Sequence, residues 1–441
     1  MRTLVLVPVV TQRDARGSGG PDGPQALPKS VHSPQDRLEE ATGLARAIDL
    51  EVASALIVPL AHPRPGTLFG SGKVEEIRAL VEQEQCGLVI VDHAVTPIQQ
   101  RNLEKAWNAK VLDRTGLILE IFGRRARTRE GRLQVELAHL TYQKSRLVRS
   151  WTHLERQRGG AGFLGGPGET QLELDRRLIQ DRIDSLKEEL ATVVRTRELH
   201  RKGRRRVPYP ITAIVGYTNA GKSTLFNRIT GASVLAKDQV FATLDPTMRE
   251  IRLPSGRRII LSDTVGFISD LPTTLVAAFR ATLEEVIEAD LILHVRDISH
   301  AEADAQAVDV AHVLGELGVV TEGPSAHILE VWNKIDRLGA EEREEAEHAA
   351  SRADERPVLV SSVTGEGLDA LLAAIDARLA SADIIVDVVV RPEEGRLLAW
   401  LYENAEVVER AADEGGAAHL KVRVPAEKRH RLDQQLKVRA S

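Results

Sequence analysis

A glycine-rich segment in the middle of the chain follows an apolar stretch and precedes a segment with helical spacing. Ala213-Ile-Val215 is the apolar stretch, Gly216-Tyr-Thr-Asn-Ala-Gly-Lys-Ser223 follows it, and a helix is predicted from Thr224 to Ile229. This order predicts a phosphate-binding loop, whose glycines let backbone N–H groups and the helix N-terminus face phosphate oxygens. Lys222 would reach the terminal phosphates and Ser223 would ligate Mg²⁺. The predicted contacts are Gly216, Tyr217, Thr218, Asn219, Ala220, Gly221, Lys222, Ser223 and Thr224.

Two further segments match the parts of a nucleotide-dependent switch. In Asp263-Thr-Val-Gly266, the carboxylate would bind Mg²⁺ through water and the Gly266 N–H would sense a γ-phosphate. Thr243 lies 20 residues after Ser223 and would add a second hydroxyl to the metal, with Thr247 as the competing candidate. These segments add Phe241, Ala242, Thr243, Leu244, Asp245, Asp263, Thr264, Val265 and Gly266 to the predicted site.

Two later motifs would recognise the base. In Asn333-Lys-Ile-Asp336, the carboxylate can accept hydrogen bonds from guanine N1–H and the exocyclic amine, a pattern that adenine cannot present. Ser361-Ser-Val-Thr-Gly365 would offer a backbone N–H to guanine O6. The base contacts are therefore expected at Asn333, Lys334, Ile335, Asp336, Ser361, Ser362 and Val363. All motifs together predict a GTPase that binds GTP, GDP and Mg²⁺, with Lys222, Thr243, Asp263 and Gly266 as its catalytic residues.

Two positions in these motifs bear on the rate of hydrolysis. Phe267 stands where many GTPases place a glutamine that orients the attacking water, and an aromatic ring cannot hold that water. We therefore expect slow intrinsic hydrolysis that a partner stimulates. Asn219 has two interpretations: it ligates a monovalent cation such as K⁺, or it caps the backbone of the loop.

The elements around the motifs predict an α/β protein. Residues 207–380 alternate strands and helices at the spacing of βαβ units, which predicts a P-loop GTPase domain with a mostly parallel sheet. Residues 1–115 predict a small α/β subdomain of the same kind, interrupted over about 13–33 by a Gly/Pro/Ser-rich insertion too poor in apolar residues to fold. Residues 381–441 predict a small α/β C-terminal domain, with strands over Ile384–Val390 and Leu420–Val424.

Residues 116–206 predict a basic helical hairpin. Leu172, Ile179, Leu186 and Val193 repeat every seven residues, and a glycine-rich tip over 158–168 separates two long helical segments. Between Ile121 and Arg206, Lys and Arg outnumber Asp and Glu by ten, although the whole chain carries a net charge of -5. This segregation favours binding to the phosphates of a structured RNA, with a solvated helix face as the alternative.

The bulk composition narrows the remaining classes. A single cysteine, Cys86, excludes an internal disulfide and indicates a reducing compartment. The apolar N-terminus is interrupted at Pro8 and predicts a buried strand instead of a signal peptide. No apolar run reaches the roughly 18 residues that a membrane span needs. We expect a cytoplasmic monomer without a membrane span.

The motifs resemble those of the HflX family of translational GTPases. The resemblance covers roughly Gly66 to Gly365 and rests on Gln134-Val-Glu-Leu-Ala138, Gly166-Pro-Gly-Glu-Thr-Gln-Leu-Glu173, the phosphate-binding loop and Phe241-Ala-Thr-Leu-Asp-Pro-Thr247. It implies that the N-terminal subdomain and hairpin enter the large ribosomal subunit near the peptidyl-transferase centre. It also implies a GTP-dependent role in splitting or rescuing stalled ribosomes under stress.

The chain departs from the family pattern in places. The family usually carries an arginine in the hairpin tip, where this chain has Phe163-Leu-Gly-Gly166, which predicts weaker contacts of the tip with RNA. The resemblance also implies ATP binding through the N-terminal domain, where Gly70-Ser-Gly-Lys73 is either a helix-opening turn or part of a second nucleotide site. Two other functions remain open: a ribosome-assembly GTPase that binds ribosomal RNA, and a signalling GTPase that binds a protein.

Overall fold

The computed structural model divides the chain into two compact units, each of which is described by itself. Unit 1 comprises Met1–Leu190, Lys237–Asp245 and Ser269–Arg280, and unit 2 comprises Ala191–Ala236, Pro246–Ile268 and Ala281–Ser441. The residues that the structure describes are 1–10, 32–126, 128–157, 167–204, 209–231, 247–269, 283, 285–320, 327–353, 355–380, 383–412, 417–425, 432 and 436. The predicted insertion over 13–33 lies almost wholly outside them, and so does most of the hairpin tip predicted over 158–168, whose last two residues begin a helix.

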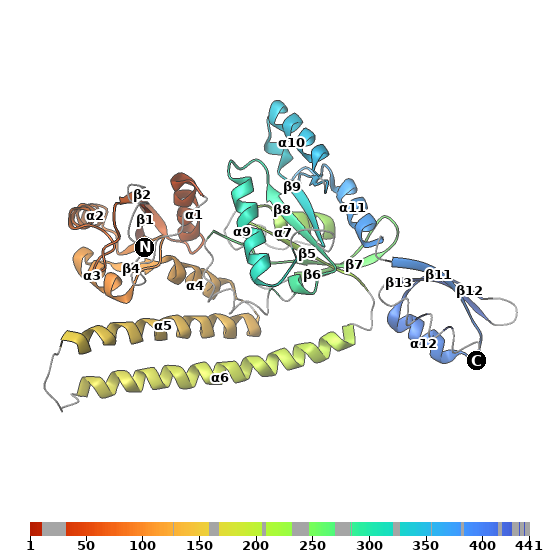
Figure 1. Cartoon of the computed structure of the whole chain (residues 1–441), viewed down its shortest axis with the longest axis horizontal. Coiled ribbons are helices and arrows are strands. Elements are labelled where there is room, and N and C mark those ends of the chain that lie inside the picture. Colours follow the sequence, from red (N-terminus) through yellow and green to blue (C-terminus); the bar gives the residue numbers. More distant parts are fainter. Residues whose placement is uncertain are drawn as a thin grey trace, which may run out of the picture. The chain divides into compact units, whose positions relative to one another are not determined.

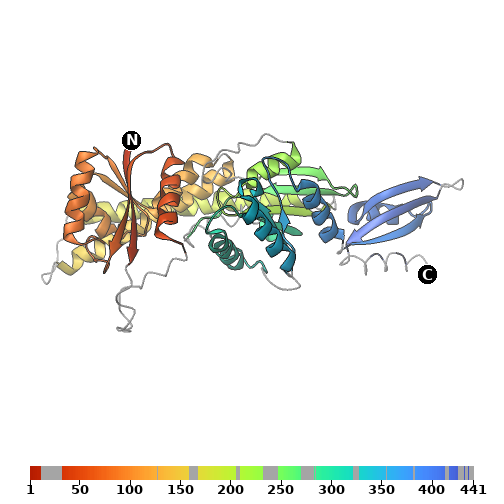
Figure 2. The ribbon, with the colours of Figure 1, turned by 90° about the horizontal axis from the view of Figure 1, so that it is seen from above.

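Unit 1 contains a four-stranded parallel sheet with helices on both faces, as Figure 2 shows. The strands are β1 (Arg2–Val10), β2 (Glu51–Leu60), β3 (Leu88–Val91) and β4 (Lys110–Asp113), in the order β2-β1-β3-β4. The helices are α1 (Pro34–Arg46), α2 (Ser71–Gln83), α3 (Pro97–Trp107) and α4 (Arg114–Arg125). All of its strand pairs are parallel, as expected where every crossover contains a helix.

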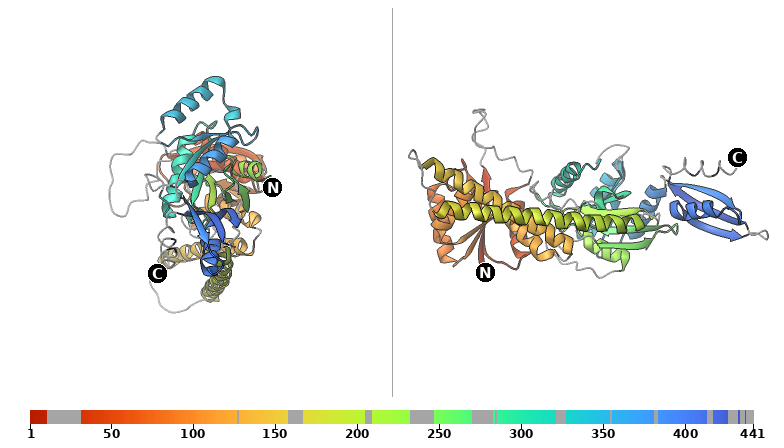
Figure 3. Two further views of the ribbon diagram at one scale, coloured as in Figure 1. Left: turned by 90° about the vertical axis from the view of Figure 1, so that its right-hand side faces the viewer. Right: turned by 90° about the horizontal axis from the view of Figure 1, so that it is seen from below.

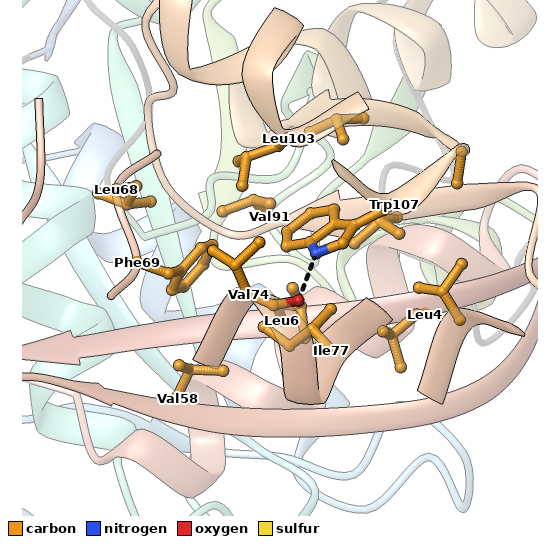
Figure 4. Close-up of a cluster of buried hydrophobic side chains, with 14 of the residues drawn as sticks. Leu4, Leu6, Val58, Leu68, Phe69, Val74, Ile77, Val91, Leu103 and Trp107 are labelled. Atoms are coloured by element: carbon orange, nitrogen blue, oxygen red, sulfur yellow. Dashed lines mark hydrogen bonds between the residues drawn. The ribbon is translucent and has the colours of Figure 1, made fainter. Parts of the chain in front are cut away.

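One core of unit 1 lies between the sheet and helices α2 and α3 (Figure 4). Trp107 is 1% exposed, and its indole Nε1 donates to the Val74 carbonyl at 3.0 Å, which joins α3 to α2. The helix ends follow local sequence rules: Thr96 and Gln99 form a capping box at the start of α3. Asp113 caps α4 through the Gly116 N–H at 2.9 Å.

Two long antiparallel helices follow α4. They are α5 (Arg129–Gln157) and α6 (Pro167–Arg204), which lie alongside each other in Figures 1 and 3. The middle of α5 is attached to the end of β4, because Asp113 accepts hydrogen bonds from the Tyr142 hydroxyl and the Arg146 guanidinium. Burial and the neighbouring Asp113 raise the pKa of Tyr142, so this hydroxyl stays a donor. The hairpin is therefore anchored at the carboxyl edge of the sheet.

Unit 2 contains a six-stranded sheet in the order β10-β9-β8-β5-β7-β6, in which only β6 runs antiparallel to its neighbour among the described strands. The strands are β5 (Ile211–Gly216), β6 (Thr247–Arg252), β7 (Arg258–Asp263), β8 (Leu291–Asp297), β9 (Ile328–Asn333) and β10 (Val358–Leu359). The helical elements are α7 (Lys222–Thr230), α9 (Ala303–Glu316), η1 (Ile335–Arg337), α10 (Ala340–Arg352) and α11 (Leu368–Ala380). The predicted α/β fold with a mostly parallel sheet is confirmed.

The last part of unit 2 is a smaller layer of strands and one helix (Figure 1). Strands β11 (Asp383–Val390), β12 (Glu406–Ala412) and β13 (Ala418–Pro425) form an antiparallel sheet in the order β11-β13-β12, covered by α12 (Gly395–Asn404). Strand β12 is an edge strand with the sequence EVVERAA, whose charged residues gave no strand signal. Among the described residues of the whole chain, the helices include none that is long and apolar enough to cross a membrane.

Candidate nucleotide-binding site

The predicted phosphate-binding loop connects β5 to α7, and two of its glycines are required by close approach. Gly216 has a φ of +149°, and an added Cβ would lie 2.1 Å from the Val295 carbonyl oxygen. Gly221 has a φ of +93°, and its Cβ would lie 2.2 Å from Asn333 Nδ2. Gly221 is also the N-cap of α7 and supplies no side-chain cap. The first turn of α7 therefore presents backbone N–H groups of the kind that bind phosphate.

Lys222 is buried at the start of α7. Its Nζ donates to the Tyr217 carbonyl within the loop at 2.6 Å. Burial lowers the pKa of Lys222 to about 8; Asp263 opposes this shift and Lys334 adds to it. An ammonium group that is buried away from water is stabilised by a nearby anion, so the loop favours a bound phosphate.

The two groups predicted to serve Mg²⁺ meet beside this lysine. Ser223 Oγ donates to Asp263 Oδ2 at 2.8 Å, and Asp263 is fully buried. Gly266 lies close by, because a Cβ added to it would be 2.9 Å from Lys222 Nζ. Thr264 points elsewhere, since its hydroxyl donates to the Ile214 carbonyl at 2.6 Å.

The predicted contacts over 241–245, including Thr243, lie outside the described residues. The competing candidate, Thr247, begins β6 and is the antiparallel partner of Asp263. Asn219 is exposed, and its backbone is in the left-handed conformation with a φ of 61°, which asparagine tolerates better than most residues.

Phe267 is an interior residue. It is 1% exposed, and its backbone is joined to the phosphate-binding loop. The Phe267 N–H donates to the Gly216 carbonyl at 3.1 Å, and the Thr218 N–H donates to the Phe267 carbonyl at 2.7 Å. The ring therefore belongs to the core, and the main chain around Gly266 is held against the loop.

The base-recognition motifs are joined to the phosphate-binding loop through one side chain. Asn333 is fully buried, its Nδ2 donates to the Ala220 carbonyl at 2.8 Å, and its Oδ1 accepts from the Ser362 N–H at 3.0 Å. The Ser361 hydroxyl donates to Asp336 Oδ1 at 2.5 Å and also accepts from the Thr364 N–H at 3.1 Å. Asp336 is thereby oriented by the neighbouring loop.

One residue of this region was not predicted from the sequence as part of the site. Asp297 ends β8 and accepts from Lys334 Nζ at 2.6 Å, while its other oxygen accepts from the Ser299 N–H and hydroxyl. Both Asp297 and Lys334 are largely buried. A carboxylate directly after an apolar strand is the signal that could have indicated it, as it does for Asp263.

Outside this site, two other predicted features can be placed. Gly70 is the N-cap of α2, and Lys73 Nζ pairs with Glu76 Oε2 at 2.6 Å on the surface, so this segment is a helix-opening turn. In the hairpin, several basic residues are used for structural pairs, such as Arg182 with Glu136 at 2.8 Å. Some of the positive charge in the described part of the hairpin is therefore neutralised by pairing within the hairpin. Arg205 and Arg206 lie outside the described residues.

Family comparisons cover the chain from Gln35 to its C-terminal region. Models described as "GTP-binding GTPase N-terminal" and "GTP-binding GTPase Middle Region" match residues 35–123 and 125–204. A model described as "50S ribosome-binding GTPase" matches residues 211–334, and one described as "HflX C-terminal domain" matches residues 346–440. The matched region of 211–334 contains the loop, the Asp263 motif and the Asn333 motif.

Individual relatives agree with these models. GTPase HflX of Magnetococcus marinus is 54% identical over 85% of this chain and 85% of the relative. GTPase HflX of Escherichia coli is 43% identical over 94% of this chain and 96% of the relative. A crystal structure described as SsGBP in complex with GDP has a TM-score of 0.48 and 24% identity, over 86% of this chain and 98% of that chain. By its sequence identity over most of its length, the chain belongs to the HflX family and is a P-loop GTPase.

Proposed function

We propose that this chain is a cytoplasmic, monomeric factor that binds the large ribosomal subunit in its GTP-bound form, rescues or splits stalled ribosomes under stress, and leaves after hydrolysis. The observation that carries the proposal is the match of residues 211–334 to a model described as a 50S ribosome-binding GTPase, with a basic hairpin in the same chain. GTPase HflX relatives that cover most of the chain support the same reading.

In this proposal the γ-phosphate is held by two donors. The Lys222 ammonium would neutralise charge that develops on the phosphate, and the Gly266 N–H would report whether the γ-phosphate is present. Both groups lie at one place, because a Gly266 Cβ would be 2.9 Å from Lys222 Nζ. Asp336, held by Ser361, would select guanine.

The residues near Lys222 fit a magnesium ion. The Ser223 hydroxyl and the Asp263 carboxylate are hard oxygen donors within 2.8 Å of each other, which is the ligand chemistry that Mg²⁺ prefers. Mg²⁺ would supply positive charge that offsets the negative charge of the phosphates. Thr243 is proposed as a further ligand, and Asn219 as a ligand of K⁺, with capping of the loop as the alternative.

Slow intrinsic hydrolysis follows from the position of Phe267. Its side chain is buried in the core and cannot orient a water molecule. We therefore expect the ribosome to complete the site, so that hydrolysis occurs after docking.

The first experiment measures GTP hydrolysis with and without purified large subunits. We expect the large subunits to increase the rate of GTP hydrolysis. An unchanged rate would favour a signalling role in which the chain binds a protein. Sedimentation with mature and immature large subunits separates rescue from assembly, because an assembly factor would bind only the immature particles.

A second experiment tests the hairpin. The triple change Arg204→Ala, Arg205→Ala and Arg206→Ala should weaken ribosome binding and reduce its salt dependence by up to about one unit of slope per lost phosphate contact. Affinity for GDP should not change. The matched control changes Arg249, Arg252 and Arg352, three exposed cations outside the hairpin, to alanine and should leave ribosome binding intact.

A further inference from the structure

The basic hairpin is attached to the N-terminal sheet at Asp113, the last residue of β4. Asp113 is 4% exposed, and its carboxylate accepts hydrogen bonds from the Tyr142 hydroxyl and the Arg146 guanidinium of α5. The same carboxylate accepts from the Gly116 N–H at 2.9 Å, so it caps α4 and holds α5 at the same time. All of these residues belong to unit 1. We call Asp113, Tyr142 and Arg146 the hairpin anchor.

Arg146 uses its guanidinium for several contacts within the protein. Its Nη2 donates to the Asp113 carboxylate and, at 3.2 Å, to the Val95 carbonyl. Its Nη1 donates to Gln100 Oε1 on α3. The guanidinium also lies over the Tyr142 ring, with its Cζ 4.4 Å from the ring centroid. A planar group with several donors in fixed directions suits these contacts, and a lysine ammonium does not.

Gln100 extends the hairpin anchor to the free edge of the sheet. β4 is an edge strand, and Gln100 Nε2 donates to the Val111 carbonyl of this strand at 2.8 Å. Glu104, also on α3, accepts from the Val111 N–H at 3.2 Å. Arg146 is therefore joined to β4 at two places, directly at Asp113 and through Gln100 at Val111.

The buried part of α5 ends before the hairpin anchor. Leu133, Val135 and Ala138 are buried in the first third of the helix. The described side chains of α5 beyond Ala138 run to Leu147, and none of them is buried. Apolar packing therefore holds only the start of α5, and the direction of the helix after Ala138 depends on the hairpin anchor.

Helix α6 is paired with α5, so the two helices share one direction. Arg182 of α6 pairs with Glu136 at 2.8 Å, and Lys144 of α5 donates to Gln180. Leu186 of α6 is fully buried. The residues that hold α5 therefore orient the whole described part of the hairpin.

We propose that the hairpin anchor is a set of positioning residues for binding to the large ribosomal subunit, which hold the hairpin in one direction before it meets RNA. The inference rests on the proposed function. A hairpin that is already held in its binding direction loses little freedom on docking. A hairpin that swings binds with an affinity reduced by the fraction of time that it points correctly. The anchor contacts no phosphate in this proposal, so its loss leaves the salt dependence of binding unchanged.

The variants Asp113→Asn, Tyr142→Phe and Arg146→Met test the proposal in the full chain. Dissociation constants for purified large subunits are measured over a series of salt concentrations. Arg146→Met and Asp113→Asn should each lower the affinity about tenfold, as expected for a hairpin that points correctly about one tenth of the time. Tyr142→Phe removes one hydrogen bond and should lower it about threefold. The slope of log affinity against log salt should equal that of the wild type in all three variants.

The variant Arg146→Lys separates the position of the hairpin from its charge. It keeps the positive charge but lacks the planar fork, so the loss of affinity should remain. If Arg146→Lys restored the affinity of the wild type, or if Arg146→Met lowered the salt slope by about one unit, Arg146 would be a phosphate contact and the positioning role would be wrong.

The direction of the hairpin is measured separately, as the distance between two spin labels. The labels are attached to cysteines that replace Glu75 on α2 and Asp181 on α6, both of which are exposed, in a Cys86→Ala chain. We expect a narrow distribution of distances with the anchor intact and a broad one in Arg146→Met. An unchanged distribution would overturn the proposal.

Ile77→Val is the matched control for stability, because Ile77 is buried between the sheet and α2, away from the hairpin anchor. It should lower the melting temperature and leave subunit affinity unchanged. An equal loss of affinity in Ile77→Val and Arg146→Met would show that binding follows stability, against the positioning role. If the wild type did not bind large subunits, the proposed function would fail. If the wild type and all the anchor variants bound equally, only the positioning role would fail.

Discussion

Replacing Asn333 by alanine should loosen the nucleotide site without removing any charged group. Asn333 is fully buried and joins the phosphate-binding loop to the Ser361 loop through the Ala220 carbonyl and the Ser362 N–H. Asn333→Ala leaves both of these backbone groups without their partner. Each buried group left unpaired costs about 1–3 kcal/mol, so the two together cost about 2–6 kcal/mol.

Most of that cost should appear in nucleotide binding, because Asn333 joins the two loops that are predicted to contact the nucleotide. Since about 1.4 kcal/mol corresponds to a tenfold change, we expect GDP affinity to fall by at least about 30-fold. The Asn333 amide also fills the space beside Gly221, so its loss lets the phosphate-binding loop relax.

Titration with a fluorescent N-methylanthraniloyl-GDP at fixed salt and Mg²⁺ measures the change. Thermal unfolding is recorded in parallel, with Val308→Ala, which alters a side chain that is 58% exposed on α9, as the control. A GDP affinity within about threefold of the wild type, with an unchanged melting temperature, would refute the bridging role of Asn333.

Three other changes test parts of the structure that do not depend on that bridge. Asp297→Asn removes the partner of the buried Lys334 ammonium and should weaken GDP binding about tenfold or more in the same titration; equal affinity would show that Lys334 needs no carboxylate. Trp107→Phe leaves the buried Val74 carbonyl unpaired and should lower the unfolding free energy of unit 1 by about 1–3 kcal/mol, measured in urea; a loss below about 0.5 kcal/mol would contradict this. Burial raises the pKa of the Cys86 thiol, so a thiol reagent should label the native chain far more slowly than unfolded chain at pH 8, with a rate that increases as the pH rises; equal rates would show that Cys86 is accessible.

Much of the fold could be predicted from local patterns. Strand β3 (Leu88–Val91) coincides with a short apolar run, and helix α3 (Pro97–Trp107) begins at a proline that is typical of a helix start. Each alternation of an apolar run with a helical period fixes one strand and its crossover, and parallel order follows from the crossovers. Edge strand β12 was not predicted, because its charged residues interrupt the apolar run that would indicate a strand.

The candidate site divides in the same way. Gly216, Lys222 and Asp336 lie in short continuous motifs. The order of residues within each motif was therefore enough to predict which residues lie beside them in the site. Asp297 contacts a lysine 37 positions away, and Asn333 contacts the Ala220 carbonyl across 113 positions. No local pattern encodes such pairs, because they depend on which strand ends meet after folding.

The anchor of the hairpin has a mechanical consequence. Tyr142 and Arg146 attach α5 to Asp113, and the helix continues beyond Arg146 for about 16 Å up to Gln157, at 1.5 Å per residue. Because this attachment lies near the middle of α5, a force on the far end of the helix would act on the end of β4 through these two side chains.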